Sequence, residues 1–182
     1  MDWFSRPPAN EARPSRGNSR PSVSEITNLL LVGEYPRVSD IEWLKREHRV
    51  TAIHNLQDDE DLRINGIDVV GLREVARRHG IKLVRTPICD GSADDMAARL
   101  QVALRDLDEL LQARERVYLH CNAGLNRAPT VAIGWLRANE GMSLDEAMAY
   151  VKKRRACGPF MTVLEAHFGP RDEKPPLRDG HK

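Results

Sequence analysis

The chain has 182 residues, of which 41% are hydrophobic, and this length favours one domain with a full core over two domains. Its 28 lysines and arginines nearly balance 27 acidic residues, so the net charge of +1 gives no global field that would attract nucleic acid. The longest apolar runs are only a few residues, far short of the roughly 20 that cross a bilayer. We therefore expect a cytoplasmic protein that binds neither nucleic acid nor membrane.

The two ends of the chain differ in composition from its middle. Residues 1–24 and 169–182 are rich in proline and in charged or small polar residues, and we expect both to be disordered tails around one domain at 25–168. The first segment lacks the apolar core of a secretory signal, but its arginines and serines leave an organelle transit peptide as an alternative. Asp2 and Glu11 argue against that alternative, because transit peptides are poor in acidic residues.

Four β-rich runs alternate with helix-periodic segments, which is typical of a sheet covered by helices. The candidate strands are Asn28–Gly33, Val50–Asn55, Ile81–Pro87 and Arg116–His120. The last three are mostly apolar on successive residues, as expected of strands buried on both faces. The pattern predicts an α/β domain with a central, mainly parallel sheet of about five strands flanked by helices.

The helices between these strands have recognisable ends. Ser39 with Glu42, and Ser143 with Glu146, form capping boxes at two helix starts. A longer helix carries leucines at spacings of three and four, which gives it one apolar stripe to face a sheet. The expected helices are Ser39–Glu47, a segment closed by Gly80, Asp94–Ala113 and Leu144–Arg154.

Two runs of like charge have ordinary interpretations. The acidic run Asp58–Asp61 is expected to form a solvated loop, with repulsion of wrong anions as the alternative. The basic run Lys152–Arg155 ends a helix, where cations complement the helix dipole. A secondary contact with a phosphorylated substrate is the alternative for the basic run.

The most informative segment joins the last candidate strand to a helix. His120 ends the strand, the segment Cys121–Arg127 follows directly, and Pro129 suits the first turn of the next helix. Gly124 permits the positive φ that a tight loop needs. Since successive loop N–H groups and the positive end of the helix converge on one point, we expect Cys121–Arg127 to be a phosphate loop.

This phosphate loop carries a nucleophile and a clamp. The field that binds a dianion also favours the thiolate of Cys121, which can attack phosphorus. Arg127 can offer two parallel N–H donors to phosphoryl oxygens, and His120 is expected to orient the loop. The competing interpretation is a buried, inert core thiol with a satisfied histidine. The residues expected to bind the substrate phosphate are Asn122, Ala123, Gly124, Leu125, Asn126 and Arg127.

Such a mechanism also needs a carboxylic acid that protonates the leaving oxygen and later activates water. Asp90 follows the third candidate strand and therefore leaves the sheet at the same edge as Cys121. Asp94 and Asp95 are the alternatives, although after Ser92 they are typical of first-turn carboxylates at a helix start.

Three cysteines form no CxxC pair and would leave an odd one in any disulfide scheme, which indicates a reducing compartment. Cys89 or Cys157 could protect Cys121 through a reversible disulfide, and inert thiols are the alternative. The histidines have no ligand spacing relative to the cysteines, so no metal is expected. Trp43 and Trp135 are expected in the core.

From Ile26 to about Phe168 the chain resembles the dual-specificity branch of the protein tyrosine phosphatases, most closely the plant glucan phosphatases and laforin. Besides His120–Pro129, the resemblance is carried by Asn55–Gln57, Gly66–Asp68, Arg85–Asp90 and Cys157–Pro159. It implies a cysteine-dependent phosphatase without metal or cofactor, in which Cys121, Arg127 and Asp90 are catalytic. It also implies a phosphorylated glucan or protein as substrate.

Three features distinguish the chain from the glucan phosphatases or from the wider family. Asn126 stands where glucan phosphatases usually have glycine, and Ala128 replaces the Ser or Thr of most members of the wider family, which implies slow turnover. Aromatic residues make up only 5% of the chain, so the platform for sugar rings is depleted, with Tyr35 and Phe160 as candidates for substrate contact. The alternatives are a phosphoprotein or lipid phosphate substrate, a small redox enzyme, and a silent phosphate-binding module.

Overall fold

The sheet has five strands in the order β1-β2-β5-β3-β4 in a computed structural model of the chain, in which residues 19–175 are described. Neighbours β2, β5, β3 and β4 run parallel, and β1 pairs antiparallel with β2. The sheet confirms the predicted α/β domain with a mainly parallel sheet. The strands are β1 Val23–Glu25, β2 Leu30–Gly33, β3 Ala52–Asn55, β4 Lys82–Arg85 and β5 Val117–His120.

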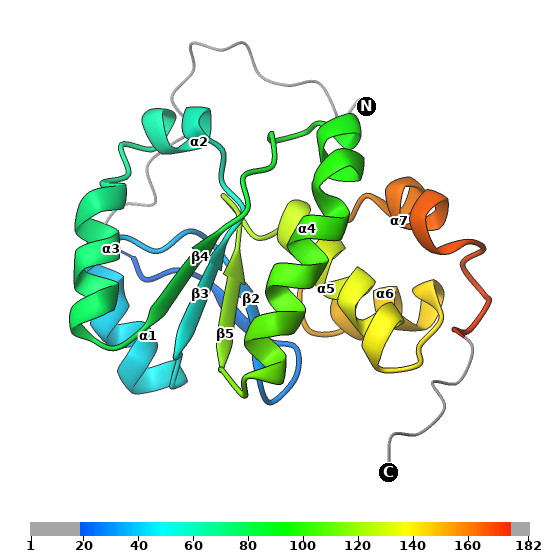
Figure 1. Cartoon of the computed structure of the whole chain (residues 1–182), viewed down its shortest axis with the longest axis horizontal. Helices are drawn as coiled ribbons and strands as arrows, with labels where there is room; N and C mark the ends of the chain where they lie inside the picture. Colours follow the sequence, from blue (N-terminus) through cyan, green and yellow to red (C-terminus); the bar gives the residue numbers. More distant parts are fainter. Residues whose placement is uncertain (1–18, 176–182) are drawn as a thin grey trace.

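Helices cover both faces of this sheet (Figure 1). On one side lie α1 (Ile41–His48) and α3 (Val69–Arg78), and on the other lie α4 (Ala93–Gln112) and α5 (Arg127–Asn139). Two further helices, α6 (Leu144–Lys152) and α7 (Met161–Phe168), pack on the second layer. The short helix α2 (Asp59–Ile64) lies beyond the carboxyl ends of the strands, at the edge where Figure 1 places the turn from β5 into α5.

Strands β3 and β5 are buried on both faces, as their apolar runs predict, and β2 is buried in the same way. Every residue of β2, β3 and β5 is buried. The prediction is wrong for the segment Ile81–Pro87, because β4 is an edge strand whose Lys82 is exposed and whose other residues are half-buried. Within the central strands, Gly33 and Asn55 both lie opposite His120, so three strands end together at one edge.

Each face of the sheet has its own apolar core. The stripe of α4 is buried as predicted and packs with α5 against one face. Tyr118 is buried on the other face, where its hydroxyl donates to the carbonyl of Glu34 at 2.6 Å. The buried stripe residues of α4 include Met96, Leu100, Leu104, Leu107 and Leu111.

One of the two predicted capping boxes forms. Ser143 and Glu146 exchange hydrogen bonds of 2.8 and 3.2 Å at the start of α6. The box predicted at Ser39 is wrong, because the carboxylate of Asp40 accepts from the backbone N–H of Arg37 at 2.9 Å. The chain therefore makes a short 3₁₀ helix η1 (Val38–Asp40) before α1 begins.

The structure bears on parts of the segments assigned to tails. Strand β1 begins at Val23, inside the segment 1–24. At the other end, the N–H of Asp145 donates to the carbonyl of Arg171 at 3.0 Å, and Lys174 pairs with Glu146 at 2.9 Å. Residues 1–18 and 176–182, on which the rest of the prediction falls, lie outside the described residues.

Candidate active site

The predicted phosphate loop lies between the end of β5 and the start of α5. Cys121 follows His120 and is only 3% exposed, and α5 begins at Arg127. Gly124 has a φ of 65°, and a Cβ at this position would lie 2.3 Å from the carbonyl oxygen of Gly33. Only glycine fits both the backbone conformation and the space, so the tight turn beside β2 depends on this residue.

The guanidinium of Arg127 is fully buried at the base of the loop. Its Nη1 donates to Asp61 Oδ2 at 2.6 Å and to the carbonyl oxygens of Ile88 at 2.7 Å and Leu56 at 3.4 Å. Its Nη2 lies 3.0 Å from Asp90 Oδ1, yet neither Nε nor Nη2 makes a hydrogen bond within residues 19–175. Two oxygens of a tetrahedral anion can bond Nε and Nη2 by displacing Asp90 from its ion pair with Nη2.

The surroundings of Arg127 keep it charged. Burial by itself lowers the pKa of Arg127, but the negative charges of Cys121, Asp90 and Asp61 outweigh burial and hold the pKa above its ordinary value. The predicted nucleophile Cys121 and the predicted acid Asp90 thus both lie within electrostatic reach of the clamp Arg127. The structure also places Asp61 in this group, which the sequence did not predict.

The acidic run Asp58–Asp61 forms the cap and first turn of α2 and is not the solvated loop that its composition predicts. Asp58 caps α2, and its carboxylate accepts from the N–H of Asp61 at 2.7 Å. The side chain of Asp61 is only 8% exposed and contacts Arg127. The signal that could have revealed this arrangement is the capping pair itself, because an acidic residue three positions after Asp58 is typical of a helix start.

His120 lies beneath the loop and is fully buried. Its Nδ1 lies 3.2 Å from the carbonyl oxygen of Cys121, so the neutral ring donates there and leaves Nε2 without a partner among the described residues. Burial lowers the pKa of His120 to about 3, so the ring is neutral at neutral pH. The orienting role of His120 stays a prediction, and among the described residues its one side-chain hydrogen bond to the loop is with the carbonyl of Cys121.

A second histidine, His54 on β3, is also buried. Its Nε2 lies 2.9 Å from the hydroxyl of Thr86, which in turn donates to Asp106 on α4 at 2.6 Å. Burial lowers the pKa of His54 to about 4. These two hydrogen bonds, between His54 and Thr86 and between Thr86 and Asp106, connect β3 and the end of β4 to α4.

The segment that follows α6 contacts the backbone of the phosphate loop through Arg155. Arg155 is buried and donates from Nε to the carbonyl of Gly124 at 2.5 Å and from Nη2 to that of Ala123 at 2.8 Å. The expected role of the basic run at a helix end is therefore wrong for Arg155, since α6 ends at Lys152. Arg155 thus bonds two loop carbonyl oxygens, which would repel an anion if they pointed toward it.

The acidic residues after β4 separate into different roles. Asp90 alone among them approaches Arg127. Asp95 Oδ2 accepts from the N–H of Cys89 at 2.6 Å, and its own N–H donates to Ser92 at 3.1 Å at the start of α4. Asp94 lies exposed in the same first turn. The two alternatives thus lie where first-turn carboxylates are expected.

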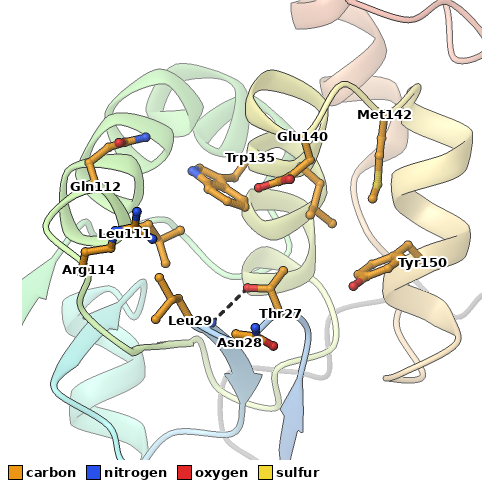
Figure 2. A pocket seen from close by; sticks show the side chains of 11 residues that line it. Thr27, Asn28, Leu29, Leu111, Gln112, Arg114, Trp135, Glu140, Met142 and Tyr150 are labelled. Carbon is orange, nitrogen blue, oxygen red and sulfur yellow. Dashed lines mark hydrogen bonds between the residues drawn. The ribbon is translucent and has the colours of Figure 1, made fainter. Parts of the chain in front are cut away.

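A separate cavity of about 480 Å³ lies near the amino end of β2, whereas the phosphate loop lies at the carboxyl ends of the strands (Figure 2). It is lined by the turn Thr27–Leu29 before β2 and by the ends of α4 and α5. Trp135, which is 7% exposed, borders this cavity while its Nε1 donates to Asp108 at 3.0 Å. Trp135 therefore belongs to the core, as predicted, and its ring lies away from the phosphate loop.

The remaining features concern the cysteine thiols, metal-ligating clusters and membrane-spanning helices. All three cysteines are free thiols. Within residues 19–175 no cluster of three or more His, Cys, Asp or Glu side chains could hold a metal ion. No helix in that range combines the length and apolar character needed to span a membrane.

Curated proteins are similar to this chain in sequence over most of the domain. Phosphoglucan phosphatase DSP4 of Castanea sativa is 33% identical over 129 residues, which cover 70% of this chain and 34% of the relative. Laforin of Mus musculus is 25% identical over 150 residues, or 76% of this chain and 46% of laforin. The dual specificity protein phosphatase Mpk3 of Drosophila melanogaster is 29% identical, over 73% of this chain and 29% of its own length.

Solved structures share the fold. The crystal structure of Tk-PTP in the active form has a TM-score of 0.68 at 25% identity and covers 80% of this chain and 95% of that chain. The structure of PTPMT1 in complex with PI(5)P has a TM-score of 0.66 at 19% identity, covering 79% and 90%. At 19% identity, the latter likeness concerns the fold alone.

The family model of the dual specificity phosphatase catalytic domain matches residues 30–164, most of the chain and all of the phosphate loop. The chain spans less than half the length of the three curated relatives described above. The chain belongs to the family of dual specificity phosphatase catalytic domains.

Proposed function

We propose that this chain hydrolyses phosphate monoesters through a cysteinyl-phosphate intermediate. The observation that supports this best is the guanidinium of Arg127, whose Nη1 edge is bonded to the protein and whose Nε–Nη2 edge has no hydrogen-bond partner among the described residues. A bidentate phosphate would complete it. Cys121 at the start of the loop and Asp90 beside Arg127 supply the other two groups that the chemistry needs.

In the first step the phosphate dianion takes the Nε–Nη2 edge of Arg127 and the free N–H groups of the loop. The thiolate of Cys121 attacks phosphorus, an S–P bond forms, and the P–O bond to the leaving group breaks. Asp90 gives its proton to the leaving oxygen. Because the phosphate takes the edge of Arg127 that Asp90 borders, its binding frees Asp90 to face the leaving oxygen.

In the second step Asp90 removes a proton from water, which attacks phosphorus and expels the thiolate of Cys121. The product is inorganic phosphate, and both groups return to their first state. Ala128, at the second position of α5, supplies no hydroxyl to assist the departing sulfur. We therefore expect this second step to limit turnover.

We propose a phosphorylated glucan as the substrate, with a phosphoprotein as the alternative. The similarity to the Castanea sativa phosphoglucan phosphatase and to laforin supports the glucan. The similarity to Mpk3, a protein phosphatase by name, supports the alternative. The short supply of aromatic side chains also favours the alternative, because sugar rings usually stack on aromatic faces.

The test compares wild type with Cys121→Ser on an aryl phosphate, a phosphotyrosine peptide and phosphorylated amylopectin. We expect wild type to release phosphate from the aryl phosphate and Cys121→Ser to release none. Cys157→Ser is the matched control, because it also loses a thiol but lies outside the phosphate loop. It should retain wild-type activity.

The natural substrates then separate the two candidates. Faster release from amylopectin than from the peptide supports the glucan, and the reverse order supports the phosphoprotein. If wild type binds tungstate but releases phosphate from none of the three substrates, the proposed hydrolysis is wrong and the chain is a silent phosphate-binding module.

A further inference from the structure

The carboxylate of Asp61 joins the two ends of the phosphate loop. Its Oδ1 accepts from the side-chain amide of Asn122, the residue after the cysteine, and its Oδ2 accepts from Arg127 at 2.6 Å. The side chain of Asp61 is 8% exposed and that of Arg127 is fully buried. One buried carboxylate thus contacts the first residue after the nucleophile and the residue that ends the loop.

Helix α2 holds this carboxylate in place from its own side. The N–H of Asp58 donates to Asp61 Oδ2 at 3.2 Å, and the carboxylate of Asp58 accepts from the N–H of Asp61 at 2.7 Å. Both the backbone and the side chain of Asp61 are therefore fixed by the start of α2. The helix positions the carboxylate before any ligand binds.

Amides complete the network around Asn122. Gln57 donates to Asn122 Oδ1 at 2.7 Å, and Asn65 donates to the same oxygen at 3.3 Å. Asn65 also donates to the backbone carbonyl of Asp61 at 2.7 Å. Both hydrogen-bonding atoms of the Asn122 side chain thus have partners. Of these partners, Gln57 lies before α2, Asp61 lies within it and Asn65 follows it.

We propose that Asp61 is a positioning residue, which holds Nη1 of Arg127 so that the Nε–Nη2 edge faces the phosphate. Asp61 does not touch the substrate in this role and acts through Arg127 and Asn122. The role deepens the proposed function and rests on it.

The charge of Asp61 makes this proposal unusually testable. A carboxylate near an anion site repels phosphate, so electrostatics alone predicts that removing the charge strengthens anion binding. Positioning predicts the opposite, because Asp61→Asn has nearly the same shape but loses the charge-assisted bond that holds Arg127. The sign of the change in anion affinity separates the two explanations.

The experiment measures the binding of tungstate, a tetrahedral dianion, by calorimetry. We expect Asp61→Asn to raise the dissociation constant about tenfold or more, as for the loss of one charged hydrogen bond. Asp61→Glu, which keeps the charge but moves the carboxylate by one methylene, should raise it as well. Unfolded protein lowers the measured stoichiometry and leaves the dissociation constant of the folded fraction unchanged, so a merely structural role predicts no shift.

Glu60→Gln is the matched control, because Glu60 lies on the same helix and pairs with the exposed Arg63 at 2.6 Å. It should bind tungstate as wild type does. Tungstate binding by Asp61→Asn that is equal to or tighter than wild type overturns the proposal. If Asp61→Asn does not fold, Asp61→Glu decides alone, and an unchanged dissociation constant in that variant has the same meaning.

Aryl phosphate turnover by wild type is measured beside these titrations. If wild type binds tungstate without turnover, the proposed hydrolysis fails while the affinity comparison still decides the role of Asp61. If wild type turns over substrate and both Asp61 variants match its affinity and its KM, only the role of Asp61 fails.

Discussion

The two sides of the phosphate loop are held by opposite chemistry. On the side of α2, a carboxylate and amides bond the side chains of Asn122 and Arg127. On the side of the segment after α6, the cation of Arg155 bonds the backbone carbonyls of Ala123 and Gly124. Toward Arg155 the loop presents two carbonyl acceptors, whereas toward α2 it presents the side-chain donors of Asn122 and Arg127 together with the acceptor Asn122 Oδ1.

This difference indicates how a short loop can present donors to an anion. Carbonyl oxygens that point into an anion site would repel the ligand, and Arg155 bonds two of them on the far side. The Nη1 group of Arg127 is bonded by Asp61, so that only one edge of its guanidinium has no hydrogen-bond partner within the described residues. The two sides should therefore respond differently to substitution.

The largest effect should come from Gly124→Ala, which disrupts the side facing Arg155. The new Cβ would lie 2.3 Å from the carbonyl oxygen of Gly33 and 2.6 Å from Arg155 Nη2, at a φ of 65°. We expect kcat/KM for an aryl phosphate to fall about a hundredfold, because the loop must shift relative to Cys121. Gly141→Ala, also at positive φ but with open space around it, is the control for backbone strain alone.

The comparison between these two glycine variants is measured by aryl phosphate turnover and thermal unfolding. Both variants should lose stability, since both replace glycine at positive φ, by about 1 to 3 kcal/mol. Only Gly124→Ala should lose activity. Normal turnover by Gly124→Ala would show that the loop tolerates displacement away from β2.

Arg155→Gln should have the next largest effect. It removes the cation that bonds two loop carbonyls, and we expect about 2 kcal/mol less stability against urea, as for charged hydrogen bonds in a buried site. Turnover should fall about tenfold as the carbonyls lose their anchor. Arg154→Gln is the matched neighbour, since Arg154 is exposed and stacks on Tyr150. That variant should retain wild-type turnover, and equal losses in both variants would contradict the anchoring role of Arg155.

A smaller effect, on pH dependence, should come from His120, which bonds the carbonyl of Cys121 where the two sides meet. Its pKa is lowered to about 3 by burial, so the folded state stays neutral while the unfolded state takes a proton below pH 6.5. Stability is therefore full above pH 6.5 and falls as the pH drops toward 3, by at most about 1.4 kcal/mol per pH unit. His120→Asn keeps a donor near Cys121 but cannot titrate.

Urea unfolding of both proteins at pH 7 and pH 5 checks this prediction. Wild type should lose about 2 kcal/mol more than His120→Asn over that interval, since the interval below pH 6.5 spans about 1.5 units. His167→Asn, at an exposed position, should behave as wild type. An identical pH dependence in His120→Asn would mean that His120 is not held neutral by burial.

The two sides of the loop also differ in how well they could be predicted from sequence. The loop itself was predictable, because a buried strand, Cys121, Gly124 and Arg127 follow one another within a few residues. Asp61 was not, because its partner Arg127 is 66 positions away and its neighbours Asp59 and Glu60 resemble a solvated run. The fold decides which member of an acidic run turns inward, and composition does not carry that information.

The same reasoning separates the strands. The burial of β3 and β5 was predictable because their residues are mostly apolar in succession, whereas β2 was predicted as a strand without a prediction of its burial. Strand β1 was missed, since it has three residues, begins in a proline- and serine-rich segment and lies at the edge of the sheet beside β2. The position of the edge strand β4 in the sequence was predicted correctly, but its burial was overestimated. An apolar run does not indicate whether another strand or helix covers it.

The smallest expected effect concerns Asn126, which ties the loop to the segment after α6. Its side-chain amide donates to the carbonyl of Gly158 at 2.6 Å, while the N–H of Gly158 donates to the carbonyl of Leu125 at 2.7 Å. Asn126→Ala removes only the first bond, so the backbone bond still holds the two segments together. We expect a loss of about 1 kcal/mol in urea unfolding and turnover within about twofold of wild type. Asn126→Gly should lose more stability than Asn126→Ala, because glycine adds backbone freedom in the unfolded chain. A tenfold loss of turnover in Asn126→Ala would mean instead that this amide positions the loop as strongly as Arg155 does.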